Sequence, residues 1–327
     1  MARLCSSLLL SLLFASSASA VALDLTPIGN PGNACDPQDN NGEAPAGCFG
    51  SVPYNYRIGT YEVTRGQYVE FLNAKAASDP LGLYNSQMGS NSGIARSGVS
   101  GTFSYSVVGG QVDKPITAVT FYDALRFANW MNNGQGSSDT ETGSYTLLGG
   151  TTTPSNGATV TRNPGANIVL SSQDEWYKAA YYAPSTSSYF DYPTGSDTQP
   201  TCATPTATAN RASCNNMGGV VNKGSYPGSA SPYGTFDQGG NAYEWNEALL
   251  TSTPCFPPGT VCRGLMGGSS YTPPIYLASF ARDFKDANDP FPDYSIGFRL
   301  VLIPEPSTGL LVIAGLLGLA VRRRAAD

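Results

Sequence analysis

The sequence predicts a coil-rich globular fold in which a few short helices alternate with short strands. Its 327 residues include 37 glycines and 24 prolines, and charged residues make up only 13% of the chain. Glycine and proline at this level favour loops and turns over long helices. Apolar residues, at 41%, are sufficient for a core. Extensive coil normally needs disulfides or bound ions to offset its ordering entropy.

Three helices are predicted from their first residues. Thr64 and Gln67 form a capping box, and the helix that follows carries Tyr68, Phe71 and Leu72 on one face. Thr120 caps a second helix over residues 121–132. A second capping box, at residues 172–175, opens a third helix that carries Trp176. Short strands are predicted over Tyr56–Val63, Pro115–Val119 and Ile168–Leu170.

The first twenty residues have the pattern of a secretory signal peptide. Arg3 precedes an apolar run over residues 8–15, and Ala18 and Ala20 supply a small-residue cleavage site. We therefore expect residues 1–20 to be removed on export.

The last residues, 304–327, form a second sorting pattern. Pro304, Glu305 and Pro306 precede an apolar segment over residues 309–321 and an arginine cluster. A helix of thirteen residues spans about 20 Å, less than the hydrocarbon core of about 30 Å, so it predicts a marginal membrane anchor. The order of elements resembles the PEP-CTERM sorting signal of Gram-negative bacteria. The resemblance implies transient inner-membrane anchoring, cleavage by an exosortase-type enzyme, and delivery to the cell surface or extracellular matrix.

Six cysteines remain once Cys5 leaves with the signal peptide. They form three sequence-local couples, which are Cys35 with Cys48, Cys202 with Cys214, and Cys255 with Cys262. An even count in an exported chain predicts three disulfides, although six cysteines allow 15 connectivities. A metal cluster is the alternative, but the sequence has no CxxC spacing.

Composition also excludes several function classes. The chain has no histidine, which rules out Ser-His-Asp and Cys-His hydrolases, HExxH zinc sites and two-histidine iron sites. A net charge of −6 argues against a nucleic-acid partner, which needs a basic surface.

Six motifs identify the body of the chain, residues 54–303, with a known family. They resemble, in order, motifs of the formylglycine-generating enzyme, or sulfatase-modifying factor, family. The segments are Ile58–Thr64, Pro115–Trp130, Leu170–Ala180, Tyr233–Trp245, Arg263–Ser269 and Gly297–Arg299. Residues 21–53 form a Gly/Asn/Pro-rich segment that resembles the exported branch of this family. The resemblance implies an α+β, C-type-lectin-like fold with small antiparallel sheets, stabilised by calcium.

The family's catalytic chemistry lacks its ligands in this chain. The family enzyme oxidises a cysteine of a sulfatase to formylglycine, with two cysteines that bind copper(I). Counted from Ser269, those two positions are Thr272 and Leu277, and neither side chain ligates copper(I). The iron-dependent branch needs histidine. We therefore expect neither copper nor iron and a non-catalytic protein. A formylglycine-type oxidoreductase with an unrecognised site is the alternative, and a protein that binds sulfatase peptides without modifying them is a third reading.

In contrast to copper and iron, calcium has candidate ligands in this chain, because the resemblance places oxygen ligands at positions where this chain has oxygen atoms. One family site maps to Asp237 and Glu244 side chains and to the carbonyls of Gly240 and Ala242, a set that suits Ca²⁺. The alternative is that both carboxylates bond turn amides. A second, weaker site maps to Asn210, Arg211, Asn215 and Met217, with an asparagine where the family has an aspartate.

The remaining candidates concern packing and binding. The three tryptophans, Trp130, Trp176 and Trp245, are expected in the core. Arg299 is expected in a buried ion pair with Glu62 or Glu175. Around the degenerate site lies an aromatic stretch of Tyr271, Tyr276, Phe280 and Tyr294. It predicts a groove for a surface glycan or peptide, as part of a binding or structural function at the cell envelope.

Overall fold

The computed structural model describes residues 20–38, 47–90, 93–250, 260–287 and 295–304. The predicted signal peptide, the apolar C-terminal segment, and the Glu305 and Pro306 of the sorting motif lie outside these ranges, as do Cys255 and Tyr294. Among the described residues, no helix is long and apolar enough to cross a membrane.

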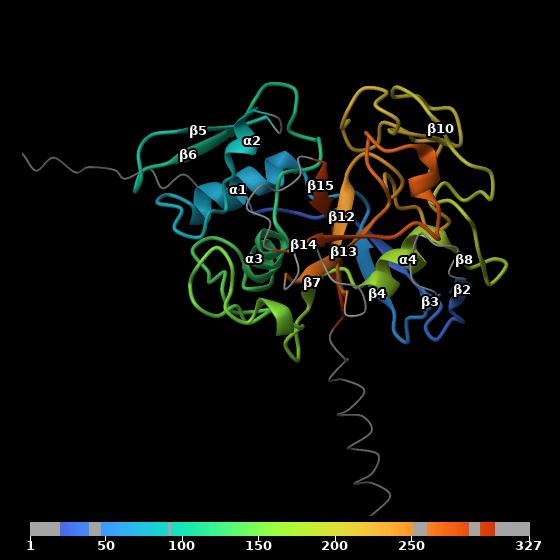
Figure 1. The fold of residues 1–327 in the computed structure, drawn as a ribbon, viewed down its shortest axis with the longest axis horizontal. Helices are drawn as coiled ribbons and strands as arrows, with labels where there is room; N and C mark the ends of the chain where they lie inside the picture. The colour runs from blue at the N-terminus through green and yellow to red at the C-terminus, as the bar shows by residue number, and fades with distance from the viewer. Residues whose placement is uncertain (1–19, 39–46, 91–92, 251–259, 288–294, 305–327) are drawn as a thin grey trace, which may run out of the picture.

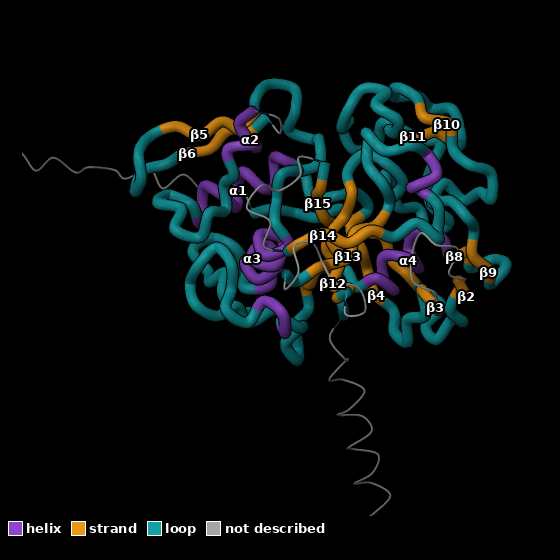
Figure 2. Tube along the Cα trace, viewed as in Figure 1, coloured by secondary structure: helices purple, strands orange, loops and turns teal. Residues whose placement is uncertain are grey.

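Short elements joined by long loops make up the described chain (Figure 2). The helices are α1 (Arg65–Lys75), α2 (Ser86–Ser90), α3 (Phe121–Asn132) and α4 (Gln173–Tyr181), with 3₁₀ turns η1 (Gly157–Thr159) and η2 (Pro274–Leu277). The strands are β1 (Leu25–Ile28), β2 (Asp36–Gln38), β3 (Gly47–Phe49), β4 (Tyr56–Gly59), β5 (Ile94–Ser97), β6 (Ser104–Val107), β7 (Ile168–Leu170), β8 (Tyr182–Ala183), β9 (Ser188–Tyr189), β10 (Thr201–Cys202), β11 (Arg211–Ala212), β12 (Tyr243–Leu249), β13 (Cys262–Met266), β14 (Asp283–Asp286), β15 (Ile296–Phe298) and β16 (Leu300–Leu302).

Two four-stranded sheets lie at the centre of the molecule (Figure 1). The first has the order β1-β4-β16-β7, and all its pairs are antiparallel. The second has the order β14-β13-β12-β15, with a parallel pair between β12 and β15. Strands β15 and β16 are separated by Arg299 alone, so this residue stands where the chain passes from one sheet to the other.

Capping explains where the three main helices begin. Thr64, Thr120 and Ser172 each accept a hydrogen bond from the backbone of the third helical residue, whose side chain bonds back to the cap. All three predicted helices are therefore confirmed. At Thr120 the reciprocal partner is Asp123, which completes a capping box that the sequence analysis had treated as a simple cap.

Aromatic side chains from α1 and α3 form the main core. Phe71, Phe127 and Trp130 contact one another with ring centroids 5.3–5.7 Å apart, and Phe298 of β15 packs edge-on against Phe127. The predicted burial of all three tryptophans is confirmed, because none is more than 2% exposed. Helices α1 and α3 lie on one side of the central sheets and α4 on the other (Figure 1).

One predicted strand is too long and another is wrong. The strand predicted over Tyr56–Val63 extends only over Tyr56–Gly59. Residues Pro115–Val119 form an isolated bridge between Pro115 and Thr64 instead of a strand. Pro115 has no amide to donate, and Ala118 has a φ of 61°, which breaks the extended conformation. The segment is nonetheless buried.

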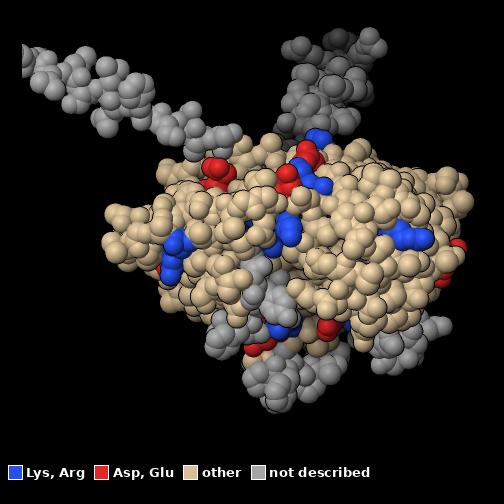
Figure 3. Space-filling model, turned by 90° about the horizontal axis from the view of Figure 1, so that it is seen from above, with Lys and Arg blue, Asp and Glu red and all other residues tan. Residues whose placement is uncertain are grey.

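Two of the predicted disulfides are present. Cys35–Cys48 joins β2 to β3, and Cys202–Cys214 closes a loop at the far end of the molecule. The third prediction involves Cys255, which lies outside the described residues. Charged side chains are few and scattered over the face seen in Figure 3.

Candidate functional site

The two positions at which the sequence resemblance predicts the copper ligands, Thr272 and Leu277, lie close together in space. They meet at Gly268, which has a φ of 68°: a Cβ on this glycine would stand 2.9 Å from Thr272 Oγ1 and 3.0 Å from Leu277 Cδ1. Thr272 Oγ1 is used locally, since it accepts from the amide of Ser269 and donates to its carbonyl. Leu277 is fully buried. Thr272 and Leu277 therefore bring a hydroxyl and a branched alkyl group close to Gly268.

A pocket of about 260 Å³ adjoins this turn. Its lining includes Tyr243, Tyr276, Arg282 and Asp283. Tyr276 precedes Leu277 in η2, and its carbonyl lies 3.2 Å from the same Cβ position on Gly268. The pocket therefore combines aromatic surface with one cation and one anion, directly beside the degenerate pair.

A buried ion pair lies near the turn that leads into β12. Arg299 Nε and Nη2 donate to the two carboxylate oxygens of Glu244 at 2.6 and 2.7 Å. Both side chains are at most 1% exposed. Trp176 Nε1 adds a third hydrogen bond to Glu244, at 2.7 Å. Two parallel charge-assisted bonds of this kind hold the carboxylate in one orientation.

The partner of Arg299 corrects the sequence-based expectation. Arg299 pairs with Glu244 instead of Glu62 or Glu175. Glu175 is taken by Arg162 at 2.6 Å and by its own capping box. The parallel register of β12 and β15, which sets Glu244 opposite Gly297, brings Glu244 and Arg299 together.

Two further carboxylates lie in the same buried region. Burial raises the pKa of Asp237 to about 6, although the charge of Arg299 opposes the shift. Burial and then the negative charge of Asp237 raise the pKa of Glu62 well above its usual range. Glu62 accepts a hydrogen bond from Asn241 Nδ2 at 3.0 Å, whereas Asp237 Oδ2 is buried and makes no hydrogen bond among the described residues. Three carboxylates thus gather around one guanidinium.

The turn that carries Asp237 is fixed by close backbone contacts. Asp237 and Gly240 have φ values of 61° and 82°, and a Cβ on Gly240 would stand 2.1 Å from the carbonyl oxygen of Ser213. Only glycine fits there. The amide of Gly240 donates to Gly267, the first glycine of the turn at the degenerate pair. This hydrogen bond therefore joins the turn at Gly267 to the segment that holds the predicted calcium residues, which are Asp237, Gly240, Ala242 and Glu244.

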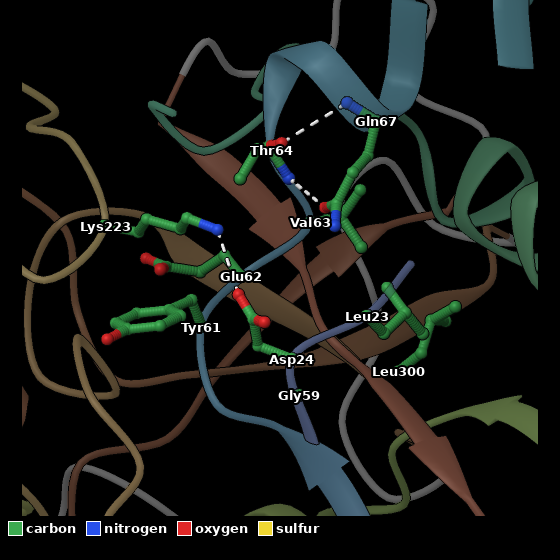
Figure 4. A pocket seen from close by; sticks show the side chains of 10 residues that line it. All are labelled: Leu23, Asp24, Gly59, Tyr61, Glu62, Val63, Thr64, Gln67, Lys223 and Leu300. Atoms are coloured by element: carbon green, nitrogen blue, oxygen red, sulfur yellow. Dashed lines mark hydrogen bonds and ion pairs between the residues drawn. The ribbon is translucent and has the colours of Figure 1, made fainter. Parts of the chain in front are cut away.

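The sequence predicts Glu62 as a possible ion-pair partner of Arg299, but it does not place Glu62 beside Asp237. Glu62 lies in the opening motif, between Tyr61 and Val63, which is the sequence feature that draws attention to it. No local pattern indicates that it lies near Asp237, which is 175 positions later in the chain. Glu62 also lines a small pocket of about 10 Å³, enough for one water or a bare cation. Figure 4 shows its carboxylate beside Tyr61 and Lys223, near the ion pair of Lys223 with Asp24 at 2.9 Å.

The residues of the weaker predicted site lie along one loop. Asn210 Oδ1 accepts from Thr194 Oγ1 at 2.7 Å, and its amide donates to the carbonyl of Thr198. The backbone of Asn215 donates to Thr272, and Met217 is 44% exposed. Arg211 lies in β11. Among the described residues no group of three or more His, Cys, Asp or Glu side chains is arranged to hold a metal.

The sheets, the loops and the turn around Gly268 define a C-type-lectin-like fold of the formylglycine-generating-enzyme type. Two solved structures are similar: Treponema denticola variable protein 1, with a TM-score of 0.57 and 18% identity, over 88% of this chain and 98% of that one, and CarF, with a TM-score of 0.53 and 17% identity, over 88% and 100%. At such identities the likeness shows the fold alone.

The chain belongs to the sulfatase-modifying factor enzyme 1-like domain family, whose pattern matches residues 33–303. A PEP-CTERM protein-sorting motif matches residues 302–324. This motif implies export to the cell envelope and recognition by an exosortase-type enzyme. A comparison with curated proteins finds no match.

Proposed function

We propose that this exported family member is a non-catalytic binding or structural protein of the cell surface or extracellular matrix. The observation that carries the proposal is the pair at Gly268, where a hydroxyl and an alkyl group stand in place of two thiolates. Neither group is a good ligand for copper(I), which is a soft ion. The adjoining pocket of about 260 Å³, with Tyr276 at its edge, supplies the binding face for a surface glycan or peptide.

Calcium is the ion that this chain is proposed to hold. Asp237 Oδ2 is buried without a hydrogen-bond partner, and two of the three neighbouring carboxylates have raised pKa values. Such an excess of buried negative charge suits a hard cation. Asp237, Glu244 and the carbonyls of Gly240 and Ala242 would hold it, and the bound ion would neutralise the cluster and stabilise the turn.

Metal content and oxygen consumption test the proposal together. The purified protein is expected to contain calcium without stoichiometric copper or iron, and to consume no O₂ with a cysteine-containing sulfatase peptide. Stoichiometric copper together with peptide-dependent O₂ consumption would establish the alternative, a formylglycine-type oxidoreductase. Binding of the peptide without its oxidation would instead show that the protein binds sulfatase peptides without modifying them.

Two tyrosines form a matched pair for the binding face. Tyr271 and Tyr276 are both 44% exposed, but only Tyr276 is in the lining of the pocket. Tyr276→Ser is expected to reduce retention of the protein on isolated envelope polysaccharide, or on the peptide, whereas Tyr271→Ser should leave it unchanged. Equal retention of both variants would refute the assignment of this pocket.

A further inference from the structure

A second cavity, of about 310 Å³, lies away from the degenerate pair. It opens between the loop before α2, the first turn of α3 and the loop that precedes η1. Its polar lining includes Asn85, Ser86, Tyr122, Asp123 and Thr153. None of the described lining residues is Lys or Arg, and Asp123 is the one carboxylate among them.

The walls of this cavity are held in place by buried hydrogen bonds. On one side, the carboxylate of Asp79 accepts from the amides of Leu83 and Tyr84 at 2.7 and 3.1 Å. On the other side, fully buried Arg126 donates to the carbonyls of Thr151 and Thr152 at 2.7 and 2.9 Å. A pocket whose walls are fixed before binding loses little entropy when a ligand enters.

The two walls meet at a glycine. Gly82 has a φ of 65°, and a Cβ at this position would stand 2.9 Å from Thr152 Cγ2. Tyr84 also lines the cavity, and its ring is fixed by Arg96, whose guanidinium carbon lies 4.6 Å from the ring centroid. The hydroxyl of Tyr84 is already used, since it donates to the carbonyl of Ile94. The cavity is thus closed at one side and carries a fixed aromatic ring.

Two buried polar groups at the start of α3 add a second observation. Tyr122 is 1% exposed, and its hydroxyl is buried without a hydrogen-bond partner among the described residues. Gly157 gives that hydroxyl its space, because a Cβ there would stand 2.1 Å from it. Asp123 is 3% exposed, and its Oδ2 accepts from the amide of Thr120. A buried hydroxyl without a partner is unusual in a folded protein and calls for a functional or structural reason.

We propose that this cavity binds one neutral sugar ring of a polysaccharide. The lining offers hydroxyls, an amide and a carboxylate to bond sugar hydroxyls, and an aromatic ring against which a sugar can pack. A carboxylate without a lining cation disfavours anionic ligands, and the density of polar groups disfavours an apolar one. The volume lies at the small end of ligand pockets, about 300–1,000 Å³, which suits a single ring. This site is separate from the pocket at Tyr276 and uses no metal.

Saturation-transfer NMR with simple sugars tests the site on the purified protein. The probes are the methyl glycosides of glucose, mannose, galactose and N-acetylglucosamine. At least one is expected to bind, with its affinity reduced about tenfold by Tyr122→Phe or Thr153→Val, which each remove one hydroxyl. Tyr122→Phe should fold normally because that hydroxyl has no partner to lose. Thr159→Val, in neighbouring η1 but outside the lining, is the control.

Each outcome decides for or against the cavity. Binding that survives EDTA and Tyr276→Ser, but weakens in Tyr122→Phe, supports it and is independent of the proposed calcium and of the pocket at Tyr276. Binding that is lost in Tyr276→Ser and kept in Tyr122→Phe overturns it in favour of the other pocket. Failure of all four glycosides to bind also overturns it.

Discussion

Replacement of Glu244 by glutamine tests the central ion pair. The carboxylate accepts two hydrogen bonds from Arg299 and one from Trp176, and neither charged side chain is more than 1% exposed. Glutamine keeps the shape but removes the charge and turns one acceptor into a donor that faces the guanidinium. Removing one partner of such a buried pair costs about 3–5 kcal/mol, because the other charge stays buried and unpaired.

The expected result is a fall in melting temperature of about 10 °C, since 1 kcal/mol corresponds to about 2–4 °C in a domain of this size. In EDTA this loss reflects the ion pair with Arg299 alone, which needs no metal. In calcium the loss should be larger, because Glu244 is also a proposed calcium ligand. Differential scanning calorimetry measures it, and Glu70→Gln, at an exposed position of α1, is the control. A loss below about 1 kcal/mol in EDTA would show that Arg299 is not buried against Glu244 as described.

The other predictions concern calcium, pH and the disulfide. Asp237→Asn removes a buried carboxylate oxygen that has no hydrogen-bond partner among the described residues. In EDTA the variant should melt at the same temperature as the wild type or higher. It should lose the calcium-dependent stabilisation, which in the wild type is about 2.7 kcal/mol of unfolding free energy at a calcium concentration a hundred times Kd. Burial raises the pKa of Asp123 from 3.8 to about 6, so the folded state binds this proton more tightly than the unfolded state, and stability should fall by about 3 kcal/mol as pH rises from about 4 to about 6. Urea titrations should show that Asp123→Asn removes this part of the pH dependence. Identical slopes of stability against pH in the wild type and the variant would contradict the shift. Replacing Cys202 and Cys214 by serine should lower the unfolding free energy by about 3 kcal/mol, because the disulfide closes a loop of sequence separation 12; an unchanged urea midpoint would exclude this contribution.

Local hydrogen bonding explains why the helices could be predicted from the sequence. Each of Thr64, Thr120 and Ser172 contacts a residue only three positions away, so the signal lies within four residues. The strand prediction at Pro115–Val119 failed because the conformation there is not determined by local hydrogen bonding. The apolar residues of this segment are buried by packing, but the φ of 61° at Ala118 breaks the extended conformation, and no local sequence pattern indicates that conformation.

The candidate sites depend on contacts that no local pattern contains. Glu244 and Arg299 are separated by 55 positions and meet because β12 and β15 pair in parallel. Glu62 and Glu175 are the partners of Arg299 expected from the sequence. Glu244 is not among them, because no local pattern indicates which carboxylate the pairing of β12 with β15 brings to Arg299. The cavity beside Asp123 is assembled from loops that are separate in the chain, and its orphaned hydroxyl is visible only once those loops are placed.

The contacts of Arg299 explain what the family's motifs contribute to the scaffold of this chain. Its guanidinium bonds Glu244 on β12 and also donates to the carbonyl of Gly59 on β4 at 2.8 Å and to that of Phe236 at 3.1 Å. One side chain thereby links the two central sheets and the turn that precedes Asp237. The residues around Glu244 and Arg299 that identify the family therefore hold the scaffold, and their presence constrains the fold strongly and the chemistry weakly. The two positions that the resemblance assigns to the copper ligands, Thr272 and Leu277, lie near the turn at Gly268 and make no contact with Arg299 among the interactions described above, so a change at either position would leave the sheets joined.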